Sequence, residues 1–398
     1  MKNSLIFNIM KNKINSFLIL LPYIWLFSGV LVYKNGNKAM VVMSLISIAT
    51  SLIVFKIDII KENLHKNYFL WSVITFAIYA IIAKLTYGFN SNEFRALLCA
   101  SLVLLTFPAE LLTRKKIIVL TLLASICTLF YSIYNHIYLG LERSALQINA
   151  VPYSTICAGI AICSFSLFLT SKNYKEKLFN IIPLLLLSSS IIILETRGVW
   201  LSFSLTIFIL LLLNLVKISL KKKLISLIFL IIITIPFSFI FKTDIEQRIQ
   251  QTSIEINKIE SGDLNTSIGL RLQMWALAPE MIKGDELLGT GENQVMKFNS
   301  LYKEGYISKS LYNFHPSHYH NQYIDNTIKG GFIGLLLLLI LLSTPLLYIK
   351  KRNQFKKNII IGIIVLYAIS SLTDVPFIHG QTMLFYTLIL CGLRNIDE

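Results

Sequence analysis

The sequence carries little charge: Asp, Glu, Lys and Arg make up 15% of its 398 residues, against about 25% in an average soluble domain. Hydrophobic residues make up 55%, and the mean hydropathy is +0.66. These residues come in blocks, many of which approach the roughly 20 residues that a helix needs to cross a bilayer. The shortage of charge excludes an ordinary soluble domain and predicts an all-α polytopic membrane protein.

Paired cysteines, a signal-cleavage pattern and internal repeats are also missing. All five cysteines fall inside apolar blocks, and none has the paired spacing of a metal or redox site, so we expect buried small hydrophobic side chains. Lys2, Lys11 and Lys13 precede the first apolar run, but this run is long enough to span a membrane and has no convincing small-residue cleavage site. We therefore expect the run to be a membrane span.

The apolar blocks predict twelve membrane spans, with one long polar segment between the ninth and the tenth. This division predicts spans 1 to 9 within residues 1–241, a large periplasmic segment with helices of its own at 242–330, and the last three spans within 331–398. The predicted spans are Ile14–Tyr33, Ala39–Phe55, Tyr68–Ala83, Phe94–Leu112, Ile117–Tyr134, Val151–Thr170, Phe179–Leu194, Trp200–Val216, Leu224–Phe241, Gly331–Ile349, Ile359–Thr373 and Gln381–Leu393.

Lysine and arginine outnumber aspartate and glutamate by 37 to 21, and in a membrane protein this excess is sorted by membrane side before a partner is inferred. With the N-terminus inside, the inner connections hold 22 of the 37 basic residues and the short outer connections hold 6. The charge therefore predicts both termini in the cytoplasm and the long polar segment outside. It is not read as a nucleic-acid footprint.

The segment 242–330 is the one stretch with the mixed charge of a soluble protein. Asp244–Glu260 and Gln294–Tyr306 have helix-like patterns, and Ile268–Met281 reads as an amphipathic helix with a break near Pro279. Aromatic residues of the segment could stack on sugars or pack the segment together, and the sequence leaves both open: Trp275, Tyr302, Tyr306, Tyr312 and Phe314.

Two arginines stand out on the outer side. Arg197 follows Glu195 in the short apolar turn after the seventh span, where an unpaired guanidinium is costly to desolvate. It is either a functional residue or a structural partner of Glu195. Arg271 opens the amphipathic helix of the long segment, where a solvated helix face is the plain alternative. The planar fork of arginine suits phosphate, because it binds two oxygens at once.

A histidine cluster closes the long segment, where His315, His318 and His320 precede the tenth span. Histidine can take a proton near neutral pH, since its unperturbed pKa is about 6.5. The spacing could suggest zinc, but no cysteine or acidic ligand is nearby and Pro316 interrupts any helical ligand face. We therefore expect a proton acceptor or a structural histidine here rather than a metal site.

Three glycines follow the histidines, at Gly330, Gly331 and Gly334. The sequence favours a helix from Asn321 that runs straight into the tenth span, with His320 and Gly331 on one face. Glycines on that face would let a neighbouring helix or a lipid tail approach closely.

The histidine stretch resembles a motif of the bacterial O-antigen ligase superfamily, a broad group that includes O-antigen polymerases. The matching residues are His320 and Asn321, followed after nine residues by Gly331 and after two more by Gly334. A topology of twelve spans with one large outer segment is similar over nearly the whole chain. This resemblance implies an all-helical enzyme of the membrane.

Further short stretches are similar to the same family. Arg197, after the seventh span, looks like the position of the family's first functional arginine, and Arg271, in the large outer segment, looks like the second. The stretches around Arg95 and Asp374 also resemble ligase sequence. The combination of these stretches is more specific than any one of them.

The resemblance implies a glycosyltransferase of the bacterial inner membrane, which takes a polysaccharide from undecaprenyl pyrophosphate at the periplasmic face and transfers it to a sugar hydroxyl of lipid A–core. The implied reaction inverts the anomeric carbon and needs neither metal nor nucleotide. It uses Arg197 and Arg271 to bind pyrophosphate and His320 as general base. Weaker candidates for binding substrate or orienting His320, each more often structural in such a setting, are Arg95, Arg143 and Asp374.

Two other functions remain open from the sequence. An O-antigen polymerase would use the same donor but add it to another lipid-linked glycan. A flippase or another transporter of lipid-linked oligosaccharides would be expected to show repeated halves or charges buried along several spans. Here the candidate residues gather on the outer side, and one large segment breaks any symmetry, which favours an enzyme.

Overall fold

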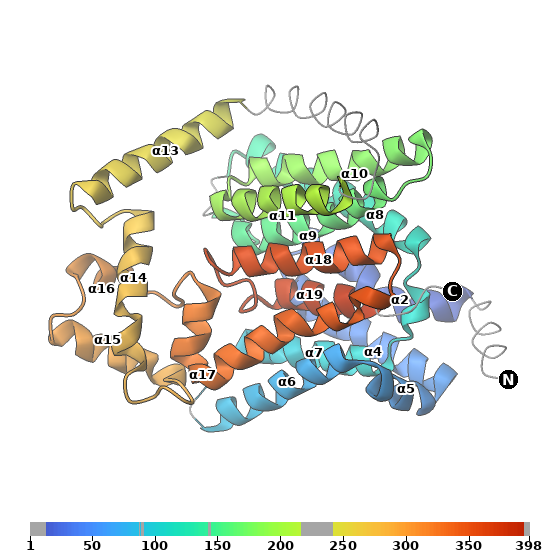
Figure 1. Ribbon diagram of the computed structural model, residues 1–398, viewed down its shortest axis with the longest axis horizontal. Helices are drawn as coiled ribbons and strands as arrows, with labels where there is room; N and C mark the ends of the chain where they lie inside the picture. Colours follow the sequence, from blue (N-terminus) through green and yellow to red (C-terminus); the bar gives the residue numbers. More distant parts are fainter. Residues whose placement is uncertain (1–12, 87, 89–90, 142–144, 216–241, 394–398) are drawn as a thin grey trace.

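The computed structural model describes residues 13–86, 88, 91–141, 145–215 and 242–393. Within these ranges every regular element is helical, as the sequence predicts. Figure 1 shows a bundle of long helices with a smaller group of helices beyond one of its ends. The helices of the bundle are α2 (Lys13–Leu26), α3 (Gly29–Val32), α4 (Gly36–Phe55), α5 (Asp58–Lys66), α6 (Tyr68–Thr86), α7 (Ser91–Thr106), α8 (Arg114–Ser132), α9 (Ala150–Leu169), α10 (Tyr174–Ile193), α11 (Arg197–Leu215), α17 (Gln322–Ser343), α18 (Gln354–Ser370) and α19 (Gly380–Gly392).

Eight helices of the described residues are long and apolar enough to cross a membrane. They coincide with eight of the predicted spans, and the shorter helices α7, α18 and α19 coincide with three more. The ninth predicted span, Leu224–Phe241, lies outside the described residues. The all-helical, multi-pass character of the chain is therefore supported, while the number of twelve spans stays a prediction.

The centre of the bundle is α9, where 89% of an 18-residue apolar stretch is buried. It packs against α8, α10, α11, α18 and α19. A Cβ atom at Gly159 would lie 2.3 Å from the ring of Phe385 on α19, so only glycine allows this approach. Ser164 donates a hydrogen bond of 2.7 Å to the Asn180 carbonyl on α10. Close packing and such bonds hold membrane helices together, because lipid is as apolar as their side chains.

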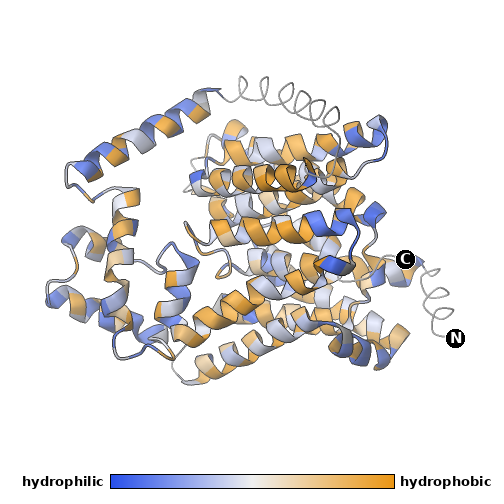
Figure 2. Ribbon diagram, viewed as in Figure 1, coloured by the Kyte–Doolittle hydropathy of each residue, from blue (hydrophilic) through white to orange (hydrophobic). Residues whose placement is uncertain are grey.

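The helices between residues 242 and 314 form a second group, which has an apolar core of its own. Its helices are α13 (Lys242–Glu260), α14 (Ser267–Ile282), α15 (Gln294–Lys303) and α16 (Lys309–Phe314). In Figure 1 the group and α5, which belongs to a predicted inner segment, lie at opposite ends of the bundle, and the sidedness itself stays a prediction. Figure 2 shows many hydrophilic residues on α13 and α15. Its core consists of Met274, Leu277, Met281, Phe298, Leu301, Ile307, Leu311, Tyr319 and Ile328.

Two expectations for this group can be compared with the structure: the helix break near Pro279 and the role of the aromatic residues. The predicted break near Pro279 is wrong, because α14 continues through it to Ile282; a proline in the last turn removes only one intrahelical hydrogen bond. The rings of Tyr302 and Tyr312 stack with centroids 3.7 Å apart, and Phe298 stacks on Tyr312. Tyr302 and Tyr312 therefore pack the segment together, whereas Tyr306 and Phe314 are exposed and their role stays open.

The glycines after the histidines join the outer group to the bundle. A Cβ at Gly289 would lie 2.4 Å from the backbone nitrogen of Gly331, and the Phe332 N–H donates to the Glu286 carbonyl at 2.9 Å. Gly331 has a φ of +63° and a ψ of −166°. The prediction of a straight helix into the tenth span is therefore wrong, since the loop before α15 packs against α17 and bends it at Gly331.

The predicted close approach at these glycines is confirmed on another side of α17. The Tyr79 hydroxyl of α6 donates to the Gly330 carbonyl at 2.7 Å, and a Cβ at Gly334 would lie 3.6 Å from the same hydroxyl. The glycines therefore serve contacts between helices within the described residues.

We predict that Gly159→Val lowers the thermal stability of the detergent-purified protein. The added side chain has no room beside Phe385, which is itself buried, and overpacking of this kind costs about 1–3 kcal/mol. The measurement is the midpoint of thermal unfolding. Ala49→Val, which adds side-chain bulk at an exposed position of α4, is the control and leaves the midpoint unchanged. Equal midpoints for all three proteins would contradict the packing described for α9.

Candidate functional site

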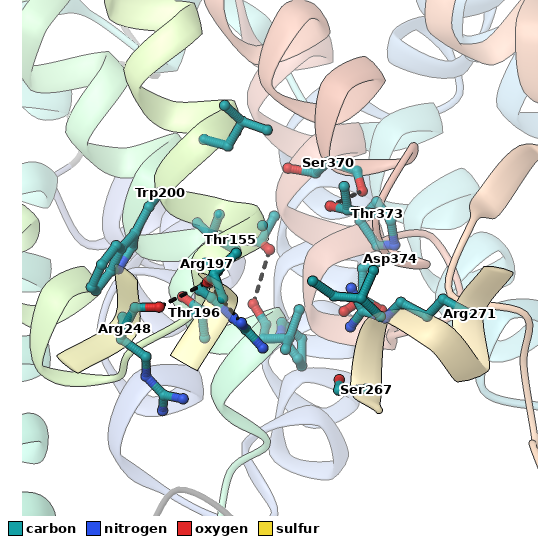
Figure 3. Close-up of a pocket in the computed structure, with 18 of the residues that line it drawn as sticks. Thr155, Thr196, Arg197, Trp200, Arg248, Ser267, Arg271, Ser370, Thr373 and Asp374 are labelled. Carbon is teal, nitrogen blue, oxygen red and sulfur yellow. Dashed lines mark hydrogen bonds between the residues drawn. The ribbon is translucent and has the colours of Figure 1, made fainter. Parts of the chain in front are cut away.

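A cavity of about 640 Å³ lies where the outer helices meet the bundle. Its walls come from α9, α11, α13, α14 and the connection between α18 and α19. Arg197, Arg271 and Asp374, three residues singled out from the sequence, all line it. Figure 3 shows the side chain of Arg271 extending toward Asp374 and Arg197 lying between α11 and α13. The structure thus brings together residues that are distant in the chain.

Arg197 is the first residue of α11, directly after a tight turn in which Glu195 has a φ of +52°. Its guanidinium donates to the Thr252 hydroxyl at 2.9 Å and to the Glu255 carboxylate at 2.7 Å, both on α13. These bonds offset the cost of partly burying the charge. The alternative of a pair between Arg197 and Glu195 is wrong, because Glu195 pairs with Arg248 instead.

Arg248 on α13 is a third arginine of the cavity that the sequence reading missed. Its side chain is 16% exposed and forms its ion pair with Glu195. Arg248, Thr252 and Glu255 are spaced by four and three residues, which places them on one face of a helix. This spacing was a signal in the sequence, although charged helices of this kind are usually solvated. The face of α13 that they form covers the turn before α11.

Arg271 lies in the second turn of α14, which begins after Thr266, whose hydroxyl accepts a hydrogen bond from the Gly269 N–H at 3.0 Å. Within the described residues no hydrogen bond to the Arg271 guanidinium is present. Burial lowers the pKa of Arg271, and the Asp374 carboxylate opposes this shift. A partly buried guanidinium with free donors at a cavity wall is suited to bind an anion.

His320 lies behind the wall of the cavity rather than on it. Its Nδ1 atom is 3.8 Å from the Asp374 Oδ1 atom, and its ring centroid is 4.3 Å from that of His318. The predicted helix face is wrong, because His320 has a φ of +48° and α17 begins only at Gln322, with Asn321 as its N-cap. His320 therefore borders the cavity through Asp374.

The hydrogen bonds around Gln322 hold this arrangement in place. The Gln322 N–H donates to the carbonyls of Ser371 and Asp374 at 2.8 and 3.1 Å. Its side-chain oxygen accepts a bond of 2.9 Å from the Phe377 N–H. The Trp275 indole of α14 donates to the Tyr319 carbonyl at 2.9 Å. The histidine stretch is thus fixed to the α18–α19 connection on one side and to α14 on the other.

The argument against a metal site near the histidines rested on the lack of a neighbouring acidic residue, and that part is wrong. A metal ion could be held by His318, His320 and Asp374. Each offers one ligand atom, and these three atoms lie within 4.8 Å of one another. Asp374 comes from a connection far away in the sequence, which is why no local spacing reveals it. Burial and the neighbouring His320 lower the pKa of His318 to about 4, so its imidazole is neutral at neutral pH.

The structure does not place the remaining predicted residues, Arg95 and Arg143, in the cavity, and it adds His379. Arg95 is exposed on α7 and does not line the cavity. Arg143 lies outside the described residues. His379, which directly precedes α19, lines the cavity and was not singled out from the sequence as a site residue. Its signal was its place in the short connection that also carries Asp374.

Comparison with known proteins agrees with the geometry. Residues 182–339 match a family model described as O-antigen ligase, and this stretch contains Arg197, Arg271 and His320. An uncharacterized protein of Haemophilus influenzae is 28% identical to the chain, over 94% of this chain and 96% of that protein. On this match, residues 182–339 carry an O-antigen ligase domain, and through this domain the chain is similar to the O-antigen ligase family.

Proposed function

We propose that the protein is an O-antigen ligase of the bacterial inner membrane, with its active site facing the periplasm. It transfers a polysaccharide from undecaprenyl pyrophosphate to a sugar hydroxyl of lipid A–core by inverting, metal-independent glycosyl transfer. The observation that carries the proposal is the meeting of Arg197 and Arg271 in one cavity that Asp374 and His320 border. The family match and the excess of basic residues on the opposite side support it.

The cavity suits a ligand with an anionic head and an apolar tail. Beside its arginines it is lined by large apolar side chains that remain exposed, including Ile249 at 62% and Leu201 at 53%. Such exposed apolar surface near membrane spans fits a polyprenyl chain. Arg197 and Arg271 then take the pyrophosphate, whose phosphate oxygens match the planar guanidinium.

The chemistry requires a good leaving group and a base. The acceptor hydroxyl oxygen attacks the anomeric carbon, the bond from that carbon to the phosphate oxygen breaks, and its electron pair stays on the pyrophosphate. Arg197 and Arg271 stabilise the charge that grows there. The proton of the hydroxyl passes to the imidazole of His320, and the Asp374 carboxylate, 3.8 Å from its Nδ1 atom, stabilises the imidazolium that forms. The acceptor hydroxyl binds beside Asp374, on the opposite side of the sugar from the pyrophosphate.

We predict that Arg271→Gln and Arg197→Gln each lower transfer about 100-fold or more, because each removes a donor that stabilises charge in the transition state. The assay uses purified protein in liposomes with a polymer linked to undecaprenyl pyrophosphate and with lipid A–core, and it follows polymer attached to lipid A–core on gels. Lys258→Gln, at an exposed cation on α13, is the matched control and keeps wild-type activity.

The same assay separates the competing functions. Polymer that grows on a lipid-linked glycan while lipid A–core stays bare would indicate a polymerase, and movement of the donor across the bilayer without transfer would indicate a transporter. Full transfer by both arginine variants would contradict the proposed site.

We predict that His320→Ala lowers transfer by about 10²- to 10⁴-fold, as loss of a general base does.

We also predict that EDTA leaves wild-type transfer unchanged, because the arginines rather than a cation at His318, His320 and Asp374 neutralise the leaving group. A loss of transfer in EDTA that zinc or magnesium restores would show that the histidine cluster works as a metal site. Wild-type activity of a well-folded His320→Ala protein would show that His320 is not the general base.

We predict that Glu255→Gln binds inorganic pyrophosphate at least fivefold more tightly than the wild type in calorimetric titrations. Glu255 is an internal anion bound to Arg197, so removing its charge removes a competitor for the guanidinium. Glutamine keeps an acceptor for the Ile268 N–H, which Glu255 binds at 3.0 Å. Glu246→Gln, at an exposed carboxylate of α13, is the control. Unchanged or weaker binding by Glu255→Gln would show that pyrophosphate does not use Arg197.

A further inference from the structure

His379 occupies a place in the cavity that no step of the proposed reaction uses. It directly precedes α19, and its carbonyl accepts bonds from the Thr382 hydroxyl at 2.8 Å and from the Met383 N–H at 3.0 Å. The backbone is therefore fixed by the start of the helix. The side chain takes no part in capping that helix, and it lines the cavity.

The surroundings of the His379 ring leave its nitrogens available. Within the described residues, no hydrogen bond to the ring is present, and its aromatic neighbour is His318, whose ring centroid is 6.4 Å away in an edge-on arrangement. Burial lowers the pKa of His379, and the Asp374 carboxylate opposes this shift. A neutral imidazole carries one donor and one acceptor, which suits a hydroxyl group better than a phosphate.

The position of His379 decides which substrate it meets. The proposed pyrophosphate ligands Arg197 and Arg271 belong to α11 and α14, whereas His379 and Asp374 belong to the connection between α18 and α19. Inversion places the attacking hydroxyl opposite the leaving pyrophosphate. Asp374 is also the residue that links the cavity to His320. Because the proposed base adjoins this wall through Asp374, we assign the wall formed by the connection to the acceptor.

We propose that His379 is a binding residue for the accepting sugar: its imidazole hydrogen-bonds a hydroxyl of that sugar and positions it beside Asp374. This inference rests on the proposed function. It extends the acceptor side beyond residues 182–339, the part of the chain that matches the family model, to the last connection. Thr373, which lines the same wall, offers a further hydroxyl to the sugar.

The test compares His379→Ala and His379→Gln with the wild type in the liposome assay, varying lipid A–core at saturating donor and then the donor at saturating lipid A–core. We expect His379→Ala to raise the KM for lipid A–core about tenfold, the effect of losing one well-placed hydrogen bond. Its KM for the donor and its binding of inorganic pyrophosphate stay within about twofold of wild type. His379→Gln, which keeps a hydrogen-bonding group, recovers part of the loss.

Each outcome decides the matter. An unchanged KM for lipid A–core in both variants, or a raised KM for the donor instead, would overturn the role of His379 and leave the proposed function standing. Failure of the wild type to transfer polymer to lipid A–core would overturn the proposed function and this inference with it. His379→Gln carries the test if His379→Ala does not fold.

Discussion

The site depends on one set of hydrogen bonds, those of Gln322. Gln322 is the first residue of α17. Its backbone N–H and side-chain oxygen form hydrogen bonds with three backbone groups of the α18–α19 connection. This fixes Asp374 between the cavity and the histidine stretch. Buried polar groups are costly when left unpaired, so these hydrogen bonds of the buried Gln322 hold the connection in one position. Without it, neither His320 nor His379 would keep its place relative to the arginines.

The charges of the cavity are arranged for exchange with an anion. Arg197 and Arg248 are paired with Glu255 and Glu195, which lets the protein keep them in a partly buried site without a ligand. Arg271 has no such hydrogen-bonded partner within the described residues. In the proposed reaction an arriving pyrophosphate would meet the guanidinium of Arg271, which has no hydrogen-bonded partner in the described residues, and would gain that of Arg197 by displacing Glu255. Because α13 carries Glu255, donor binding and the position of α13 are coupled in this account.

Much of this arrangement follows from the sequence, and the rest fails for definable reasons. Apolar blocks predicted the bundle helices. Arg197 was identified because an arginine in an apolar turn needs a partner, and Arg271 because its stretch resembles the ligase family. The straight helix into the tenth span was wrong, since a tertiary contact between Gly289 and Gly331 bends it. Asp374 was recognised as a candidate, but its contact with His320 spans 54 positions, and local spacing cannot reveal such a contact. Arg248 was missed because a charged helix such as α13 is usually solvated, and His379 was missed because its place in the connection beside Asp374 was not used.

The central claim is that Arg197 and Arg271 together hold the pyrophosphate of a lipid-linked donor. The most direct measurement is a cryo-electron microscopy structure of the full chain in a lipid nanodisc with bound undecaprenyl pyrophosphate. The account predicts that the two phosphates lie within hydrogen-bonding distance of both guanidinium groups and that Glu255 has left Arg197. It also predicts that Asp374, with His320 behind it, faces the phosphates across the space for the sugar. Phosphates bound elsewhere, with the pair of Arg197 and Glu255 intact, would contradict it.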